Sequence, residues 1–143
     1  MKKVRHTYYS NPDSEDLMFA DVKAFLQDIP VNEKLLNNIL LAISEAFTNA
    51  LIHGNKWESS KTVEVILAIK DREFLADIID EGECNLSALE GRPEPDPMAE
   101  GGRGMNLIKN CSDSASFSKD EKSGGLRVSL KFNLDTKITV GWK

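Results

Sequence analysis

The sequence predicts an α/β (α+β) two-layer sandwich, in which a mostly antiparallel sheet carries its helices on one face. Two patterns predict it. Strand-like segments with alternating apolar residues follow one another in hairpin pairs, and a long segment repeats apolar residues at helical spacing. The expected order is β, α, α, β, β, loop, α, β, β, in a single domain over residues 1–143.

The chain is expected to start with an edge strand, since β-favouring residues occupy Val4–Tyr9. Residues 11–14 have the composition of a turn and a helix cap. Apolar residues then recur at helical spacing up to Pro30, which predicts a first helix.

The strongest helix follows. Asn32 is its expected cap, and Gly54 with Asn55 is its expected end. Its apolar stripe, spaced by three or four residues, consists of Leu36, Ile39, Leu40, Ile43, Phe47, Ala50 and Leu51.

An antiparallel hairpin comes next, because residues 62–69 alternate, residues 70–73 have turn character, and residues 74–80 alternate again. Three prolines, several acidic residues and glycines then break regular structure up to residue 104. A loop of this length inside a compact domain is usually functional, so we expect a lid over about residues 82–104. The remaining predicted elements are a short helix over about 103–111, strands around 115–117 and over 128–134, and a small edge strand or tail over 136–142.

Composition excludes some classes of function. The formal net charge of -5 lacks the electrostatic signature of a protein that binds DNA or RNA. We expect no apolar run that spans a bilayer and no signal peptide, and therefore a cytoplasmic protein. The two cysteines, Cys84 and Cys111, have no zinc-like spacing and are expected to be reduced thiols.

Three polar residues of the long helix share one edge, because Glu45, Asn49 and His53 recur at every fourth position. An amide oxygen suits Mg²⁺, which prefers oxygen ligands, and a carboxylate one turn away can deprotonate a hydroxyl. Alone, the spacing also fits a polar helix edge with local hydrogen bonds.

Two further segments have the composition of a nucleotide site. Asp80 ends a strand where it can accept a hydrogen bond from the amine of adenine, and Gly82 allows a flat base to approach the backbone. Gly102, Arg103 and Gly104 immediately precede the predicted short helix, where free N–H groups and a guanidinium favour phosphate. Alone, these segments also fit a turn and a hinge.

The order of these pieces resembles the N, G1 and G2 boxes of the gyrase, histidine-kinase and MutL ATPase superfamily. The boxes read Glu45-x-x-x-Asn49-Ala50-x-x-His53, Asp80-x-Gly82 and Gly102-x-Gly104-Met105. Within that superfamily, residues 43–54 and 101–108 look like those of the anti-sigma-factor serine/threonine kinases.

The resemblance implies a Bergerat-type ATP-binding fold with ATP and Mg²⁺ as cofactors. It implies that Asn49 ligates the metal, Glu45 is the catalytic base and Asp80 reads adenine. His53, Gly82 and the segment Gly102, Arg103, Gly104 and Met105 would complete the nucleotide site. The implied substrate is a serine or threonine of a STAS-type anti-anti-sigma partner, with a sigma factor as a second partner and homodimerisation permitted by the first strand.

The sequence departs from the family pattern at two positions. Cys84 replaces the last glycine of the G1 box, and Leu126 replaces the threonine whose hydroxyl supports the adenine-reading aspartate. Loss of that hydroxyl is expected to weaken nucleotide binding by about 0.5–1.5 kcal/mol. A non-catalytic module that sequesters a partner is therefore the alternative function. A sensor histidine kinase is disfavoured, because the only other histidine is His6, in a strand-like segment.

Overall fold

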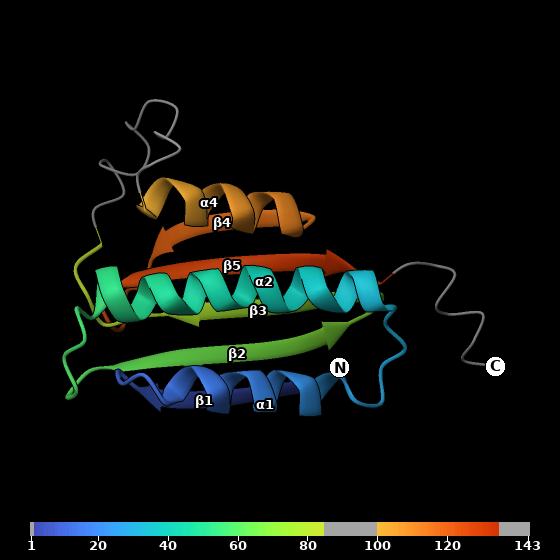
Figure 1. Cartoon of the computed structure of the whole chain (residues 1–143), viewed down its shortest axis with the longest axis horizontal. Helices are drawn as coiled ribbons and strands as arrows, with labels where there is room; N and C mark the ends of the chain where they lie inside the picture. The colour runs from blue at the N-terminus through green and yellow to red at the C-terminus, as the bar shows by residue number, and fades with distance from the viewer. Residues whose placement is uncertain (1, 85–99, 135–143) are drawn as a thin grey trace.

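The computed structural model describes residues 2–84 and 100–134, with side chains described outside residues 100–105. Its elements are β1 (Lys2–Tyr9), α1 (Ser14–Leu26), α2 (Glu33–Asn49), a π-helical turn η1 (Ala50–Gly54), β2 (Thr62–Lys70), β3 (Glu73–Ile79), α4 (Glu100–Cys111), β4 (Ser114–Lys119) and β5 (Leu126–Asn133). The strands form one sheet in the order β1-β2-β3-β5-β4, and all four pairings are antiparallel (Figure 1).

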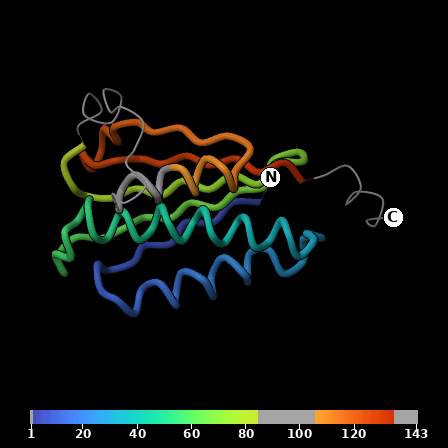
Figure 2. The backbone as a smooth tube through the Cα atoms, turned by 45° about the horizontal axis from the view of Figure 1, so that its top comes forward, coloured from blue at the N-terminus to red at the C-terminus, as the bar shows by residue number. Residues whose placement is uncertain are grey.

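The described elements form two layers, since α1, α2 and α4 lie on one face of the sheet (Figures 1 and 2). The alternation predicted from sequence is correct: Val63, Val65 and Leu67 of β2 point into the core, as do alternate residues of β3 and β5. Three aromatic rings from α1 and the sheet, Phe25, Phe74 and Phe132, stack along the centre of this core. The predicted fold class is therefore confirmed.

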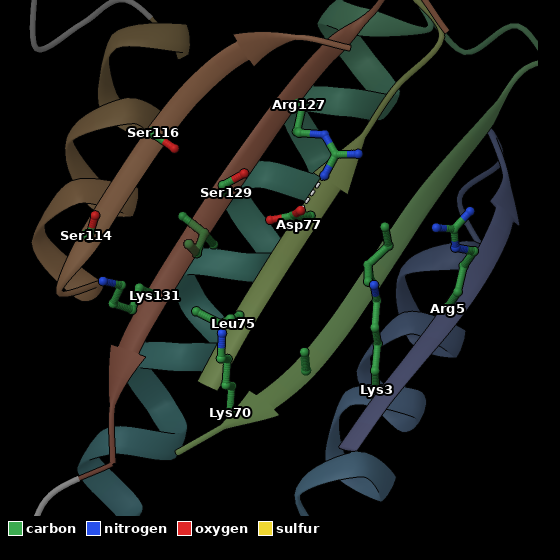
Figure 3. A pocket seen from close by; sticks show the side chains of 13 residues that line it. Lys3, Arg5, Lys70, Leu75, Asp77, Ser114, Ser116, Arg127, Ser129 and Lys131 are labelled. Carbon is green, nitrogen blue, oxygen red and sulfur yellow. Dashed lines mark hydrogen bonds and ion pairs between the residues drawn. The ribbon is translucent and has the colours of Figure 1, made fainter. Parts of the chain in front are cut away.

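No described helix covers the opposite face of the sheet. Long side chains rim a shallow depression of about 540 Å³ on it, among them Lys3, Arg5, Lys70 and Lys131 (Figure 3). Arg127 lies on this face beside Asp77, with which it forms an ion pair (Figure 3). The same arginine also contacts the turn between β4 and β5 through Asp120.

The central helix begins where the sequence predicts, because the Asn32 side chain accepts a hydrogen bond from the N–H of Leu35 at 2.7 Å. We expected no segment that could span a bilayer. The 22 helical residues Glu33–Gly54 are nevertheless long and apolar enough to cross one, judged by length and composition only. The core helix of a soluble protein passes the same test. Ile39, Ile43 and Phe47 of this helix are fully buried in the core.

Element boundaries differ from expectation mainly in α4. The prediction placed the glycine run before a helix that starts near residue 103, whereas α4 starts at Glu100 and includes Gly101, Gly102 and Gly104. Glycine has a poor helix propensity, so sequence reasoning set the helix start too late. The last residues of the predicted lid (82–104) therefore belong to α4. Residues 85–99 of the lid and the predicted tail at 136–142 lie outside the described residues.

We expect Asn32→Ala to lower the free energy of unfolding by about 1 kcal/mol, because it removes the side-chain cap of α2. Urea titration measures the effect. Asn37→Ala, at an exposed position inside the same helix, is the matched control and should not destabilise. An equal loss in both variants would contradict a capping role for Asn32.

Candidate functional site

Two of the residues predicted from sequence meet across a small cavity between α2 and the sheet. Asn49, at the end of α2, and Asp80, directly after β3, both line it. Its volume is about 20 Å³, room for roughly one water molecule. The other lining residues are Ala46, Ala50, Ile78, Ile108, Phe117, Leu126 and Val128.

Asp80 is the buried charge of this region, with 4% of its surface exposed. Its Oδ1 accepts hydrogen bonds from the N–H groups of Gly82 at 2.9 Å and Leu126 at 3.0 Å. Burial raises the pKa of this carboxyl, against the opposing effects of the two N–H donors and of the Lys61 charge. Among the described residues no donor reaches Oδ2.

Two glycines, Gly54 and Gly125, pack against Asp80, and a third, Gly82, packs against Gly54. A Cβ at Gly54 would lie 2.1 Å from Asp80 Oδ2, and one at Gly125 would lie 2.2 Å from its carbonyl oxygen. A Cβ at Gly82 would lie 2.1 Å from the carbonyl oxygen of Gly54. These are distances that no side chain tolerates, so the backbone approaches Asp80 this closely only because the residues are glycines.

The π-helical turn η1 brings Gly54 to this position. The N–H of Asn55 closes the turn on the carbonyl of Ala50 at 2.8 Å, and such turns are frequent at functional sites. The fully buried Asn55 side chain then donates to Ser10 Oγ and to the Thr62 carbonyl. Its Oδ1 accepts from the N–H of Glu81 at 2.7 Å, so Asn55 ties the helix end to the residue after Asp80.

The other predicted residues lie apart from this cavity or outside the description. Glu45 lies on α2 one turn before Asn49 and is partly exposed, and His53 is exposed on η1. Neither lines the cavity. Gly102, Arg103, Gly104 and Met105 belong to the first turns of α4, and their side chains lie outside the described residues.

Both departures from the family pattern have a structural counterpart. The N–H of Cys84 donates to the Gly124 carbonyl at 3.3 Å, and burial together with the Asp80 charge raises the pKa of its thiol. Leu126 has no side-chain hydroxyl, but its main-chain N–H donates to the Asp80 carboxylate. This N–H donor could not be predicted from the sequence, because main-chain donors have no sequence signature.

We expect Asp80→Asn to remove a pH dependence of stability. Because burial raises the folded pKa of Asp80 above its ordinary value of 3.8, the unfolded chain loses this proton first as pH rises. The contribution of Asp80 to the free energy of unfolding is thus fully present below pH 3.8 and is lost as pH rises through the folded pKa. The variant, whose amide oxygen can still accept both N–H bonds, should gain stability relative to the parent over this window.

Urea unfolding of both proteins from about pH 3 to pH 7 measures this difference. Asp71→Asn, in the exposed β2–β3 turn, is the matched control for the loss of one carboxylate. A parent-minus-Asp80→Asn difference that stays constant with pH would show that burial of Asp80 does not perturb its titration.

Comparison with known proteins places this geometry in a family. Residues 9–132 match the histidine kinase-like ATPase domain family. Curated relatives include the "Anti-sigma F factor" of Clostridium perfringens (strain SM101 / Type A), 27% identical over 139 residues that cover 94% of this chain and 98% of the relative. The protein of the same name from Shouchella clausii is 28% identical and covers 94% of each chain.

A solved structure shows the same fold. It contains the RsbU and RsbW domains of Rv1364c from Mycobacterium tuberculosis and aligns with a TM-score of 0.69 at 19% identity. The match covers 93% of this chain but only 32% of that longer chain. The resemblance to anti-sigma-factor kinases is confirmed by the curated relatives, and the chain belongs to the histidine kinase-like ATPase domain family.

Proposed function

We propose that the protein binds ATP with Mg²⁺ and phosphorylates a serine or threonine of a STAS-type anti-anti-sigma partner. The observation that carries the proposal is the Asp80 carboxylate, which is buried and held through Oδ1, while no described residue donates to Oδ2. A fixed acceptor of this kind selects the amine of adenine. Membership of the ATPase family and similarity to proteins named anti-sigma F factor support the same function.

Each predicted residue then has a role. Asp80 would accept the adenine amine, with Gly82 beside the base, and the Asn49 oxygen would ligate the metal that neutralises phosphate charge. Glu45, one turn earlier on α2, would accept the proton of the substrate hydroxyl.

The remaining residues of the proposed site concern the nucleotide. His53 on η1 would complete nucleotide binding. Gly102, Arg103, Gly104 and Met105 would hold the phosphates, as the family pattern implies. Of these, Gly102 and Arg103 lie in the first turn of α4, where the N–H groups have no partner within the helix.

The proposed site requires more space than the described residues leave. A cavity of about 20 Å³ is far below the roughly 300–1,000 Å³ of most ligand pockets. A purine would therefore displace wall residues such as Ile108, which is fully buried on α4. If the protein does not bind ATP, the small cavity supports the alternative function, a non-catalytic module that sequesters its partner.

The cellular setting that we propose follows the anti-sigma relatives. The protein would act in the cytoplasm, bind a sigma factor as its second partner, and form a homodimer. β1 is an edge strand of the sheet, as predicted, so its outer backbone groups are available for pairing.

Asn49→Ala should abolish saturable MgATP binding, because it removes the proposed metal ligand. Titration calorimetry measures binding of the parent and the variant, and Asn37→Ala on the same helix is the control. Binding that survives both Asn49→Ala and EDTA would contradict the metal assignment. Absence of MgATP binding by the parent at about millimolar concentration, the weak limit of useful affinity, would support the sequestering module.

Glu45→Gln should retain MgATP binding and lose phosphoryl transfer, because the amide cannot accept the hydroxyl proton. Transfer of labelled phosphate from ATP to a STAS-type protein is the measurement. Glu33→Gln, an exposed change in the first turn of α2, should transfer at the parental rate. If Glu45→Gln also transfers at the parental rate, Glu45 is not the base.

A further inference from the structure

The turn between β4 and β5 contacts Asp80 through the side chain of Ser123. Ser123 Oγ donates to the carbonyl oxygen of Asp80 at 2.8 Å and accepts from the N–H of Gly125 at 3.1 Å. The main-chain N–H of Ser123 donates to Asp120 Oδ2 at 2.9 Å. Ser123 therefore connects the turn to the end of β3, 43 residues away in the chain.

Asp120 fixes the turn from inside. Its main-chain N–H donates to the Gly125 carbonyl at 2.8 Å, and its carbonyl accepts from Gly124 at 2.7 Å. These bonds, with the N–H of Ser123 on its carboxylate, hold Asp120 to Gly125 as one closed loop. Gly124, at φ +79°, has the left-handed backbone that such a loop needs.

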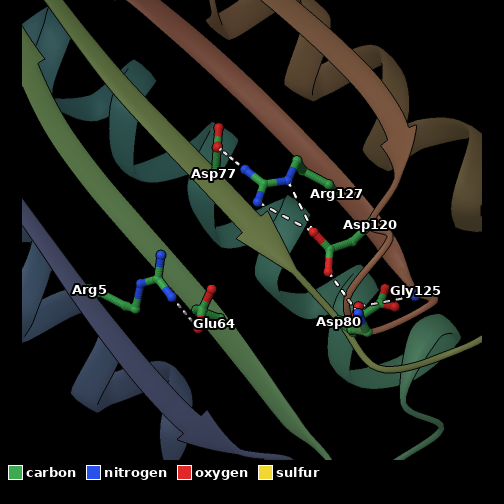
Figure 4. Close-up of polar contacts among 8 residues, drawn as sticks. Arg5, Glu64, Asp77, Asp80, Asp120, Gly125 and Arg127 are labelled. Carbon is green, nitrogen blue, oxygen red and sulfur yellow. Dashed lines mark hydrogen bonds and ion pairs between the residues drawn. The ribbon is translucent and has the colours of Figure 1, made fainter.

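Arg127 anchors this loop to the sheet face opposite the helices. Its Nε donates to Asp120 Oδ1 at 3.3 Å, and its other guanidinium nitrogens contact Asp120 and Asp77 (Figure 4). The N–H of Ser123 and the guanidinium together lower the pKa of Asp120, so its carboxylate stays charged. A continuous chain of polar contacts thus runs from Arg127 through Asp120 and Ser123 to Asp80.

One bond in this chain does not serve the hairpin. Main-chain bonds between Asp120, Gly124 and Gly125 close the β4–β5 turn, whereas the hydroxyl proton of Ser123 is donated outside the turn, to Asp80. The loop is also in tight contact with its target, because a Cβ at Gly125 would lie 2.3 Å from Asp80 Oδ1. A shift of this loop therefore moves the backbone and the carboxylate of Asp80 together with the N–H of Leu126.

We propose that Ser123 is a positioning residue for Asp80, supported by Asp120 and Arg127. We call these three residues the turn brace. The brace takes the place of the side-chain hydroxyl that Leu126 lacks, since it holds the main chain of Asp80 while the N–H of Leu126 holds the carboxylate. The nucleotide part of this inference rests on the proposed function, whereas the structural part does not.

Ser123→Ala tests the brace by base selectivity. Inosine carries an oxygen where adenine carries its amine, so a well-placed Asp80 carboxylate prefers MgATP to MgITP. Ser123→Ala should weaken MgATP binding roughly three- to tenfold, the effect of one hydrogen bond, and should leave MgITP binding nearly unchanged. Ser123→Thr keeps a hydroxyl and should restore the preference, and Ser118→Ala, exposed on β4, should have no effect.

A second measurement does not depend on nucleotide. Amide hydrogen exchange should accelerate roughly three- to tenfold at Gly82 and Leu126 in Ser123→Ala, because their acceptor loses its support, while the amides of β2 keep their protection. Equal weakening of MgATP and MgITP, or unchanged exchange at Gly82 and Leu126, would overturn the positioning role. Failure of the parent to bind either nucleotide would contradict the proposed function, and the exchange rates alone would then decide the brace.

Discussion

Burial of the Asp80 carboxylate is the constraint to which the surrounding structure conforms. A charge that is 4% exposed is costly unless hydrogen bonds compensate it. Here the compensation comes from the main chain, through the N–H groups of Gly82 and Leu126. The close packing around Asp80 explains the glycines at positions 54 and 125, where a Cβ would collide with this residue, and the glycine at 82, where a Cβ would collide with Gly54. A neutral residue here would avoid this cost, so the buried charge is not explained by stability alone.

The end of the central helix is shaped by the same constraint. A regular α-helix would continue past Asn49, but the chain widens into η1 and then enters a left-handed conformation at Lys56 and Trp57. This path sets Gly54 against Asp80 and buries Asn55, whose side chain joins three separate segments. The helix end is therefore part of the site: the turn keeps a main-chain hydrogen bond from Asn55 to Ala50, and the Asn55 side chain adds contacts to neighbouring segments.

Sequence reasoning predicted what periodicity encodes and missed what depends on the main chain. The alternation in β2 and β5 and the stripe of α2 follow from burial, so these elements were predicted with correct faces. Asn49 and Asp80 could be paired because the family pattern relates them. Gly54 and Asn55 were interpreted only as a helix stop, since a π-helical turn has no pattern of its own. The start of α4 was predicted too late, because the glycine run suggested a loop.

The substitution at Leu126 shows why a single missing side chain is poor grounds for declaring a site lost. The expected cost, one hydroxyl near the base, assumed that nothing else holds the aspartate. In the structure the residue that lost its hydroxyl still donates its N–H to the carboxylate, and a serine three positions earlier holds the carbonyl of Asp80. That serine is in turn fixed by Asp120, whose charge is matched by Arg127. The orientation of Asp80 thus depends on a loop rather than on one side chain. Arg127 also pairs with Asp77 on the sheet face opposite the helices, so one guanidinium joins that face to Asp120 and the loop.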